Sequence, residues 1–174
     1  MRKTGHVAMA ALLAAVACQT AETPEQMRAR MQTESDAARA AIEQAMAAFA
    51  RHVGAGNADS VAALYADNAV LMPPNMAAAT GRAAIREAFA GMLSGGAPTI
   101  HFTVQSVVAN GPLAVERGRY HLTMPAAAGQ PAMADSGKYL VHWHKVGDRW
   151  MIQEDVWNSD APAAPPEPAP RRRS

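Results

Sequence analysis

The stretch LYADNAVLMPP, Leu64–Pro74, is separated by six residues from GRAAIR, Gly81–Arg86. Within it, Ala69–Met72 is an apolar run of strand length. Two prolines stop this strand, because proline has no N–H group for a sheet. Gly81 then opens a segment whose apolar residues recur at helical spacing. The centre of the chain is therefore predicted to be a short strand that leads through a proline turn into a helix.

Two further helices are expected before this stretch. Thr23 can cap a helix whose first residue is Pro24, and Gln26 can complete a capping box. Apolar residues recur at helical spacing from there until Gly54 and Gly56 end the helix. Asn57 can cap a short second helix. The first part of the chain is thus predicted to be a long helix followed by a short one.

The second half of the chain changes to the period of a β-strand. Apolar and polar residues alternate from Ile100 onward, and Asn110-Gly111 favours a tight hairpin turn. Three further strands are expected, over Leu113–Met124, Lys138–Lys145 and Trp150–Asn158. A turn at Gly147-Asp148 joins the last two. Helices followed by antiparallel strands indicate an α+β fold.

Residues 1–17 have the pattern of a secretory signal: two basic residues, an apolar run and small residues before a cleavage site. The apolar run is too short to span a bilayer. Ala15–Cys18 also resembles a bacterial lipobox, in which Cys18 receives lipid and becomes the first mature residue. Ala15 departs from the leucine usual there. Ordinary cleavage after Ala17, leaving a free thiol, is the alternative. We expect an exported protein of the periplasm or cell envelope, lipid-anchored through Cys18.

The remaining composition favours one domain with a tail. Residues 161–174 are rich in proline and predict a disordered tail with three arginines just before the last residue. The domain proper is expected over residues 20–160. A formal net charge of +1 gives no electrostatic footprint for nucleic acid. The single cysteine excludes an intrachain disulfide.

Three segments together resemble a known family: Leu64–Pro74, Gly81–Arg86, and Trp150 through Asp160. They look like the SnoaL-like group of the nuclear-transport-factor-two-like superfamily, and most like the uncharacterised bacterial subfamily grouped with SgcJ and EcaC. The resemblance covers roughly residues 37–160. It implies a cone, in which a curved antiparallel sheet wraps on the long first helix, with two shorter helices and an internal cavity. It also implies that dimers are common. The fold serves many unrelated functions.

The resemblance does not carry over the known catalytic groups of this superfamily. Ketosteroid isomerase uses a carboxylate base, a tyrosine and a protonated aspartate. The matching positions here hold Pro73, Phe49 and either Leu140 or Val141. SnoaL-type cyclases use an aspartate where this chain has Asn158, an amide that cannot act as a general base. Neither activity is expected.

A different polar pair is predicted on the last two strands. If Gly147-Asp148 is a tight turn and pairing runs on without interruption, His142 shares a face with Asp155. The resemblance turns that face toward the cavity, although a one-residue slip would reassign the faces. A carboxylate that orients a histidine can make a proton-transfer pair, so both are candidate catalytic residues. The alternative is that both are ordinary polar residues on an exposed face. The expected pocket residues are Tyr65, Met72, Phe89, His142, Asp155, Trp157 and Asn158.

No metal or organic cofactor is expected. His142 and His144 lie two residues apart on one strand, and His101 or His121 could add a third ligand. Strand alternation often produces this spacing by chance, and the sequence has no second cysteine or glutamate-rich cluster. No glycine-rich phosphate loop suggests a nucleotide, flavin or nicotinamide.

Three functions from different classes follow from these observations. The first is a homodimeric binding protein that holds a small apolar or amphipathic molecule in the cone. The second is an enzyme of isomerase, hydrolase or dehydratase type that transfers a proton with His142 and Asp155. The third is an envelope scaffold, which would have a filled cone.

Overall fold

Helix α1 (Pro24–Gly54) is the longest element of the computed structural model, which describes residues 21–126 and 131–162. The Thr23 hydroxyl accepts from the N–H of Gln26, and the Gln26 side chain accepts from the N–H of Thr23. This reciprocal capping box confirms the predicted start of the helix. The predicted signal segment, Cys18 and residues 163–174 of the tail lie outside the described residues. No helix within the described ranges is long and apolar enough to span a membrane.

The central segment follows the predicted order, except that one boundary is shifted and the two-residue strand β2 was not predicted. Helix α2 (Ala58–Ala62) leads into β1 (Tyr65–Met72), and the short β2 (Ala79–Thr80) precedes α3 (Arg82–Leu93). Strand β1 starts four residues before the predicted Ala69. The reason is a tertiary contact, since the N–H of Ile152 donates to the carbonyl of Leu64 and recruits the preceding residues into the sheet.

The sheet has six strands in the order β2-β1-β6-β5-β4-β3. Its long strands are β3 (Thr99–Asn110), β4 (Leu113–Met124), β5 (Met133–Val146) and β6 (Arg149–Ser159). Neighbouring strands are antiparallel except β1 and β6, which run parallel. The expectation of a wholly antiparallel sheet was wrong at this junction. Because β2, α3, β3, β4 and β5 lie between β1 and β6 in the chain, the two strands can run in the same direction.

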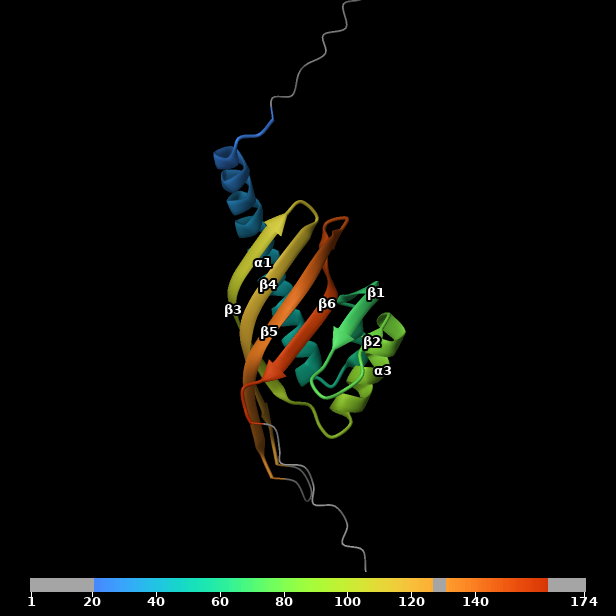
Figure 1. Cartoon of the computed structure of the whole chain (residues 1–174). Coiled ribbons are helices and arrows are strands. Elements are labelled where there is room, and N and C mark those ends of the chain that lie inside the picture. Colours follow the sequence, from blue (N-terminus) through green and yellow to red (C-terminus); the bar gives the residue numbers. More distant parts are fainter. Residues whose placement is uncertain (1–20, 127–130, 163–174) are drawn as a thin grey trace, which may run out of the picture.

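Helices cover one face of the curved sheet and leave the other open (Figure 1). Helix α1 crosses behind β3 to β6, and α3 lies beside β1 and β2. The buried residues of both helices point into the space between helices and sheet: Ser35, Ala38, Ile42, Met46, Phe49, Val53, Ile85 and Phe89. This arrangement confirms the α+β cone with a long helix and two shorter ones. The face that α1 covers is called the inner face below.

Two tyrosine–glycine pairs lie on the inner face where β4 meets β5. Tyr139 is paired with Gly118, and Tyr120 with Gly137. A side chain at either glycine would overlap the ring of the opposite tyrosine. The two rings can therefore lie across the sheet only because both opposing positions are glycine.

Strands β5 and β6 lose the expected register at a β-bulge. Lys145 pairs with Trp150 and Trp143 with Ile152, as the tight turn at Gly147-Asp148 predicts. Beyond the bulge, His142 pairs with Glu154. Gln153 is the extra residue of the bulge. It shifts the register by one, so every later residue of β6 lies on the face opposite to the predicted one.

Candidate functional site: an apolar cavity with one carboxyl

A cavity of about 240 Å³ lies between α1, α3 and the inner face of the sheet. Its wall is almost entirely apolar and includes six aromatic rings. The aromatic residues are Phe49, Phe89, Phe102, Tyr120, Tyr139 and Trp157. Among the described residues, Asp155 is the only charged side chain on the wall. The internal cavity that the resemblance implied is therefore present.

Asp155 is held in place by Tyr65. The Tyr65 hydroxyl donates to Asp155 Oδ2 at 2.6 Å, and the two side chains are 0% and 7% exposed. Burial raises the pKa of Asp155 to about 6, and the hydrogen bond from Tyr65 opposes part of that rise. Burial, together with the neighbouring Asp155, raises the pKa of Tyr65 well above its ordinary value. Tyr65 therefore stays protonated and acts as a donor at neutral pH.

A second buried carboxyl lies two strands away on the same inner face. Glu116 pairs with Val141, which in turn pairs with Asp155. The Tyr139 hydroxyl donates to Glu116 Oε1 at 2.6 Å, and the Trp143 indole N–H donates to Oε2 at 2.9 Å. Burial raises the pKa of Glu116 to about 7, with both hydrogen bonds opposing and the charge of Asp155 adding to the rise. Glu116 itself does not reach the cavity wall.

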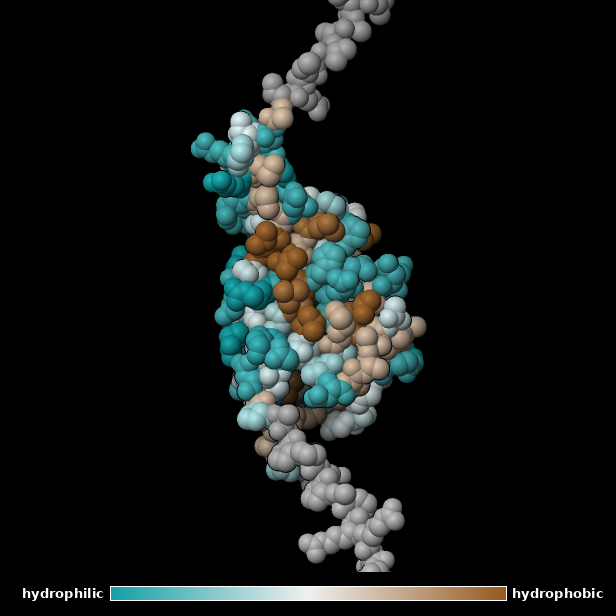
Figure 2. Space-filling view, viewed as in Figure 1, coloured by the Kyte–Doolittle hydropathy of each residue, from teal (hydrophilic) through white to brown (hydrophobic). Residues whose placement is uncertain are grey.

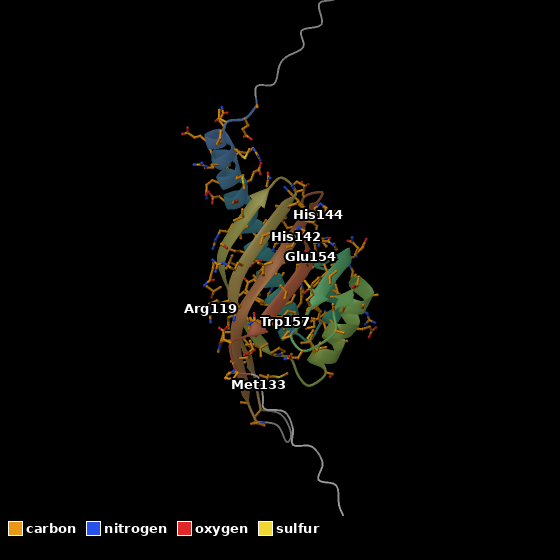
Figure 3. All side chains as sticks on the ribbon, in the orientation of Figure 1. Arg119, Met133, His142, His144, Glu154 and Trp157 are labelled. Carbon is orange, nitrogen blue, oxygen red and sulfur yellow. The ribbon has the colours of Figure 1, made fainter. Side chains whose placement is uncertain are left out.

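The structure does not bring His142 and Asp155 together. His142 Nδ1 lies 3.0 Å from Glu154 Oε2 on the outer face, where Figure 3 shows both side chains on neighbouring strands. Asp155 pairs with Val141 and lies on the inner face. The prediction that His142 and Asp155 form a proton-transfer pair is therefore wrong. The bulge at Gln153 moves Asp155 to the face opposite His142.

Some of the other expected pocket residues line the cavity, and some lie outside its wall. Phe89 and Trp157 line the cavity together with Asp155. Tyr65 stands behind Asp155 as its donor. Met72 pairs with Val156 outside the cavity wall, and Asn158 is exposed. Asn158 was expected because it stands at the position of the cyclase aspartate, but alternation in the strand turns its side chain outward.

Sequence reasoning missed Glu116 and the two cavity tyrosines, Tyr120 and Tyr139. The signal was present in β4, where Ala114, Glu116, Gly118 and Tyr120 share the inward phase. An acidic residue in that phase indicates a buried carboxyl that needs donors. The residues that supply them, Tyr139 and Trp143, belong to the next strand, and only strand pairing brings them near.

A metal site finds no support in the side-chain arrangement that the structure describes. Residues 21–126 and 131–162 contain no group of three or more histidine, cysteine, aspartate or glutamate side chains that could hold a metal ion.

The fold of this chain is the one seen in nuclear-transport-factor-two-like structures. Its sequence matches the SnoaL-like domain family over residues 34–155, and the chain belongs to that family. The narrower SgcJ and EcaC grouping stays a prediction. No curated protein sequence matches it significantly.

Solved structures share the fold at low sequence identity. A ketosteroid isomerase-like protein from Erwinia carotovora atroseptica is 21% identical, with a TM-score of 0.63, over 71% of this chain and 96% of that one. A nuclear-transport-factor-two-like protein with a cystatin-like fold from Novosphingobium aromaticivorans is 15% identical, with a TM-score of 0.63, over 83% and 95%. At these identities the likeness shows the fold alone.

Proposed function

We propose that this protein binds a small, largely apolar molecule in its cavity, with a polar group of the ligand against Asp155. The observation that carries this proposal is the cavity wall, which is apolar except for one buried carboxyl. Binding pockets typically combine a hydrophobic wall with a few placed polar groups. A cavity also argues against the scaffold alternative, for which a filled cone was expected.

The size of the cavity limits the ligand. A dry cavity of about 150 Å³ lined by aliphatic and aromatic side chains holds benzene. A cavity of about 240 Å³ therefore accommodates one ring with a short side chain.

A cavity-blocking substitution tests this proposal. Leu122 lines the cavity, whereas Thr123, the next residue of β4, is exposed on the outer face. Leu122→Trp should fill the cavity, and Thr123→Trp adds the same side chain outside it. We expect ligand-observed NMR to detect 2-phenylethanol on the wild type and on Thr123→Trp, but not on Leu122→Trp. Equal binding to all three proteins would place the ligand elsewhere and contradict the proposal.

A second candidate function is proton transfer by Asp155 alone. The specific observation in its favour is a buried carboxyl that faces an apolar cavity with a pKa raised to about 6, which suits a general base near neutral pH. An apolar ketone such as 2-tetralone should then exchange hydrogen for deuterium beside its carbonyl in heavy water. Exchange that persists unchanged in Asp155→Asn would exclude this role.

We also propose a homodimer formed through the outer face of the sheet. Exposed apolar residues lie on neighbouring strands there, Val108 beside Val115 and Leu140 beside Val156, and Figure 2 shows hydrophobic side chains gathered across this face. Arg117 and Glu154 add opposite charges near these apolar pairs, on strands β4 and β6. A sheet face that carries both positive and negative charges can pack against the same face of a second copy of the chain. Light scattering should show a dimer for the wild type and a monomer for Leu140→Glu.

Export with a lipid anchor at Cys18 is likewise a proposal, supported by the sequence of residues 1–18. Intact mass of the protein from a bacterial membrane fraction tests it: acyl chains on Cys18 are expected, and a mature chain that starts at Cys18 without them would exclude the anchor.

A further inference from the structure

The cavity has a negative charge on its wall and no positive one. Asp155 lines it, and no lysine, arginine or histidine does so in the part of the chain that the structure describes. No basic side chain among the described residues forms an ion pair with Asp155. The one side-chain hydrogen bond of Asp155 in this part of the chain comes from Tyr65. A buried carboxylate normally has a cationic partner. Here the protein does not supply one.

One oxygen of this carboxyl is available to a ligand. Tyr65 donates to Oδ2, and no described residue donates to Oδ1. Asp155 is 7% exposed and belongs to the cavity wall. The desolvation of this carboxylate is already part of the free energy of the folded protein. A ligand donor that reaches Oδ1 therefore gains a partner without a further desolvation penalty on the protein side.

The neighbouring ionisable groups do not neutralise Asp155. Glu116 on β4 adds a second acid on the same face, and Tyr65 and Tyr139 are neutral donors. On α1, Arg39 forms an ion pair with Glu43. On α3, both basic side chains are bound to other acids, Arg82 to Asp67 and Arg86 to Glu87.

Aromatic rings line the same cavity as the carboxyl of Asp155. Trp157 lies two residues beyond Asp155 on the same face of β6. Tyr139, on β5, pairs directly with Trp157. Both rings line the cavity, as do Phe49 and Phe89, which pack edge to face at 5.6 Å between centroids. The faces of aromatic rings attract cations, and aromatic cages are a recurring arrangement for ammonium ligands.

We propose that the ligand of this cavity is an amine: an apolar, ring-containing body whose protonated amino group binds Asp155 Oδ1. This inference rests on the proposed binding function and narrows it to one class of ligand. An ammonium supplies both the missing countercharge and the missing donor. A carboxylate or phosphate ligand is excluded, since it would face Asp155 without any cation between them.

Three probes of equal size and different terminal group test the inference: 2-phenylethylamine, 2-phenylethanol and propylbenzene. Their dissociation constants are measured on the purified full chain by ligand-observed NMR at pH 7.5 and pH 5. At pH 7.5 the amine should bind roughly tenfold to a hundredfold more tightly than the alcohol, the range for a hydrogen bond between charged groups. At pH 5 its affinity should fall about tenfold, because Asp155 is then protonated, while that of the alcohol stays the same.

Two variants locate the effect. Asp155→Asn keeps the shape of the side chain and removes its charge, so it should abolish the preference for the amine and leave propylbenzene binding in place. Glu154→Gln removes a carboxylate one residue away on the outer face and should leave the preference intact.

The possible outcomes separate this inference from the function on which it rests. Equal binding of all three probes would overturn the amine inference and leave the apolar cavity site standing. Loss of the amine preference in Glu154→Gln but not in Asp155→Asn would place the amine on the outer face and also overturn it. Failure of every probe to bind would contradict both proposals.

Discussion

Every tyrosine of this chain donates its hydroxyl to a carboxylate. Tyr65 donates to Asp155, Tyr139 to Glu116 and Tyr120 to Asp135. The first two carboxyls are buried, whereas Asp135 is half-buried and also accepts from Ser159. The hydroxyl of Tyr65 therefore matters most, because among the described side chains it alone donates to Asp155, whereas buried Glu116 also accepts from Trp143.

Removal of that hydroxyl should destabilise the domain. Tyr65→Phe leaves a buried carboxyl without its donor, and we expect a loss of about 1–3 kcal/mol in the free energy of unfolding at pH 7.5. Tyr120→Phe is the matched control, since Asp135 keeps Ser159 as a partner, and it should lose about 1 kcal/mol or less. Urea denaturation of both variants checks the order, and a larger loss in Tyr120→Phe would refute this account of the site.

At this scale, the sequence predicted Asp155, Phe89 and Trp157 as pocket residues, and all three line the cavity, but the predicted partner of Asp155 was wrong. His142 was chosen because uninterrupted alternation put it on the same face. Tyr65, the actual partner, lies 90 residues earlier. No periodicity within one strand can reveal a contact that depends on the parallel pairing of β1 with β6.

The elements themselves were largely readable from local chemistry. The capping box at Thr23 and the hairpin signal at Asn110-Gly111 mark boundaries that the structure confirms. Both signals act within a few residues. The β-bulge at Gln153 has no such local signal, and neither does the early start of β1, because both depend on which strand lies alongside.

The junction of β4 and β5 gives a prediction at the scale of elements. A Cβ at residue 137 would lie closer than 3.0 Å to the backbone oxygen of Asn158 and to the ring of Tyr120. Gly137→Ala should therefore lower the free energy of unfolding by about 1–3 kcal/mol through overpacking.

Gly91→Ala is the comparison variant for this prediction. Gly91 lies within α3, and a Cβ there meets nothing within 4 Å. Alanine should stabilise the helix by about 0.5–1 kcal/mol. Thermal unfolding of both variants provides the measurement, and a neutral Gly137→Ala would mean that β5 can move away from β6 at this point.

At the scale of the whole molecule, the two buried acids link stability to pH. The pKa of Glu116 rises from 4.5 to about 7 on folding, and that of Asp155 from 3.8 to about 6. Between these values the folded protein holds protons that the unfolded chain has released, so stability falls as pH rises. We expect the domain to be more stable at pH 5 than at pH 8, by on the order of a few kcal/mol.

Glu116→Gln tests the origin of this dependence. Glutamine can bond to both Tyr139 and Trp143 but does not ionise, so the difference between pH 5 and pH 8 in urea denaturation should shrink. The lowered pKa values of Glu34, Asp135 and Asp160 act at pH values below this window and do not interfere. A difference that Glu116→Gln leaves unchanged would show that Glu116 is not its source.

The central claim is that the cavity is a ligand site whose polar end is Asp155. A crystal structure of the protein with 2-phenylethylamine tests this most directly. The account predicts the ring within the aromatic wall and the amino nitrogen about 3 Å from Asp155 Oδ1. An empty cavity at saturating ligand, or a ligand whose amino group points away from Asp155, would contradict it.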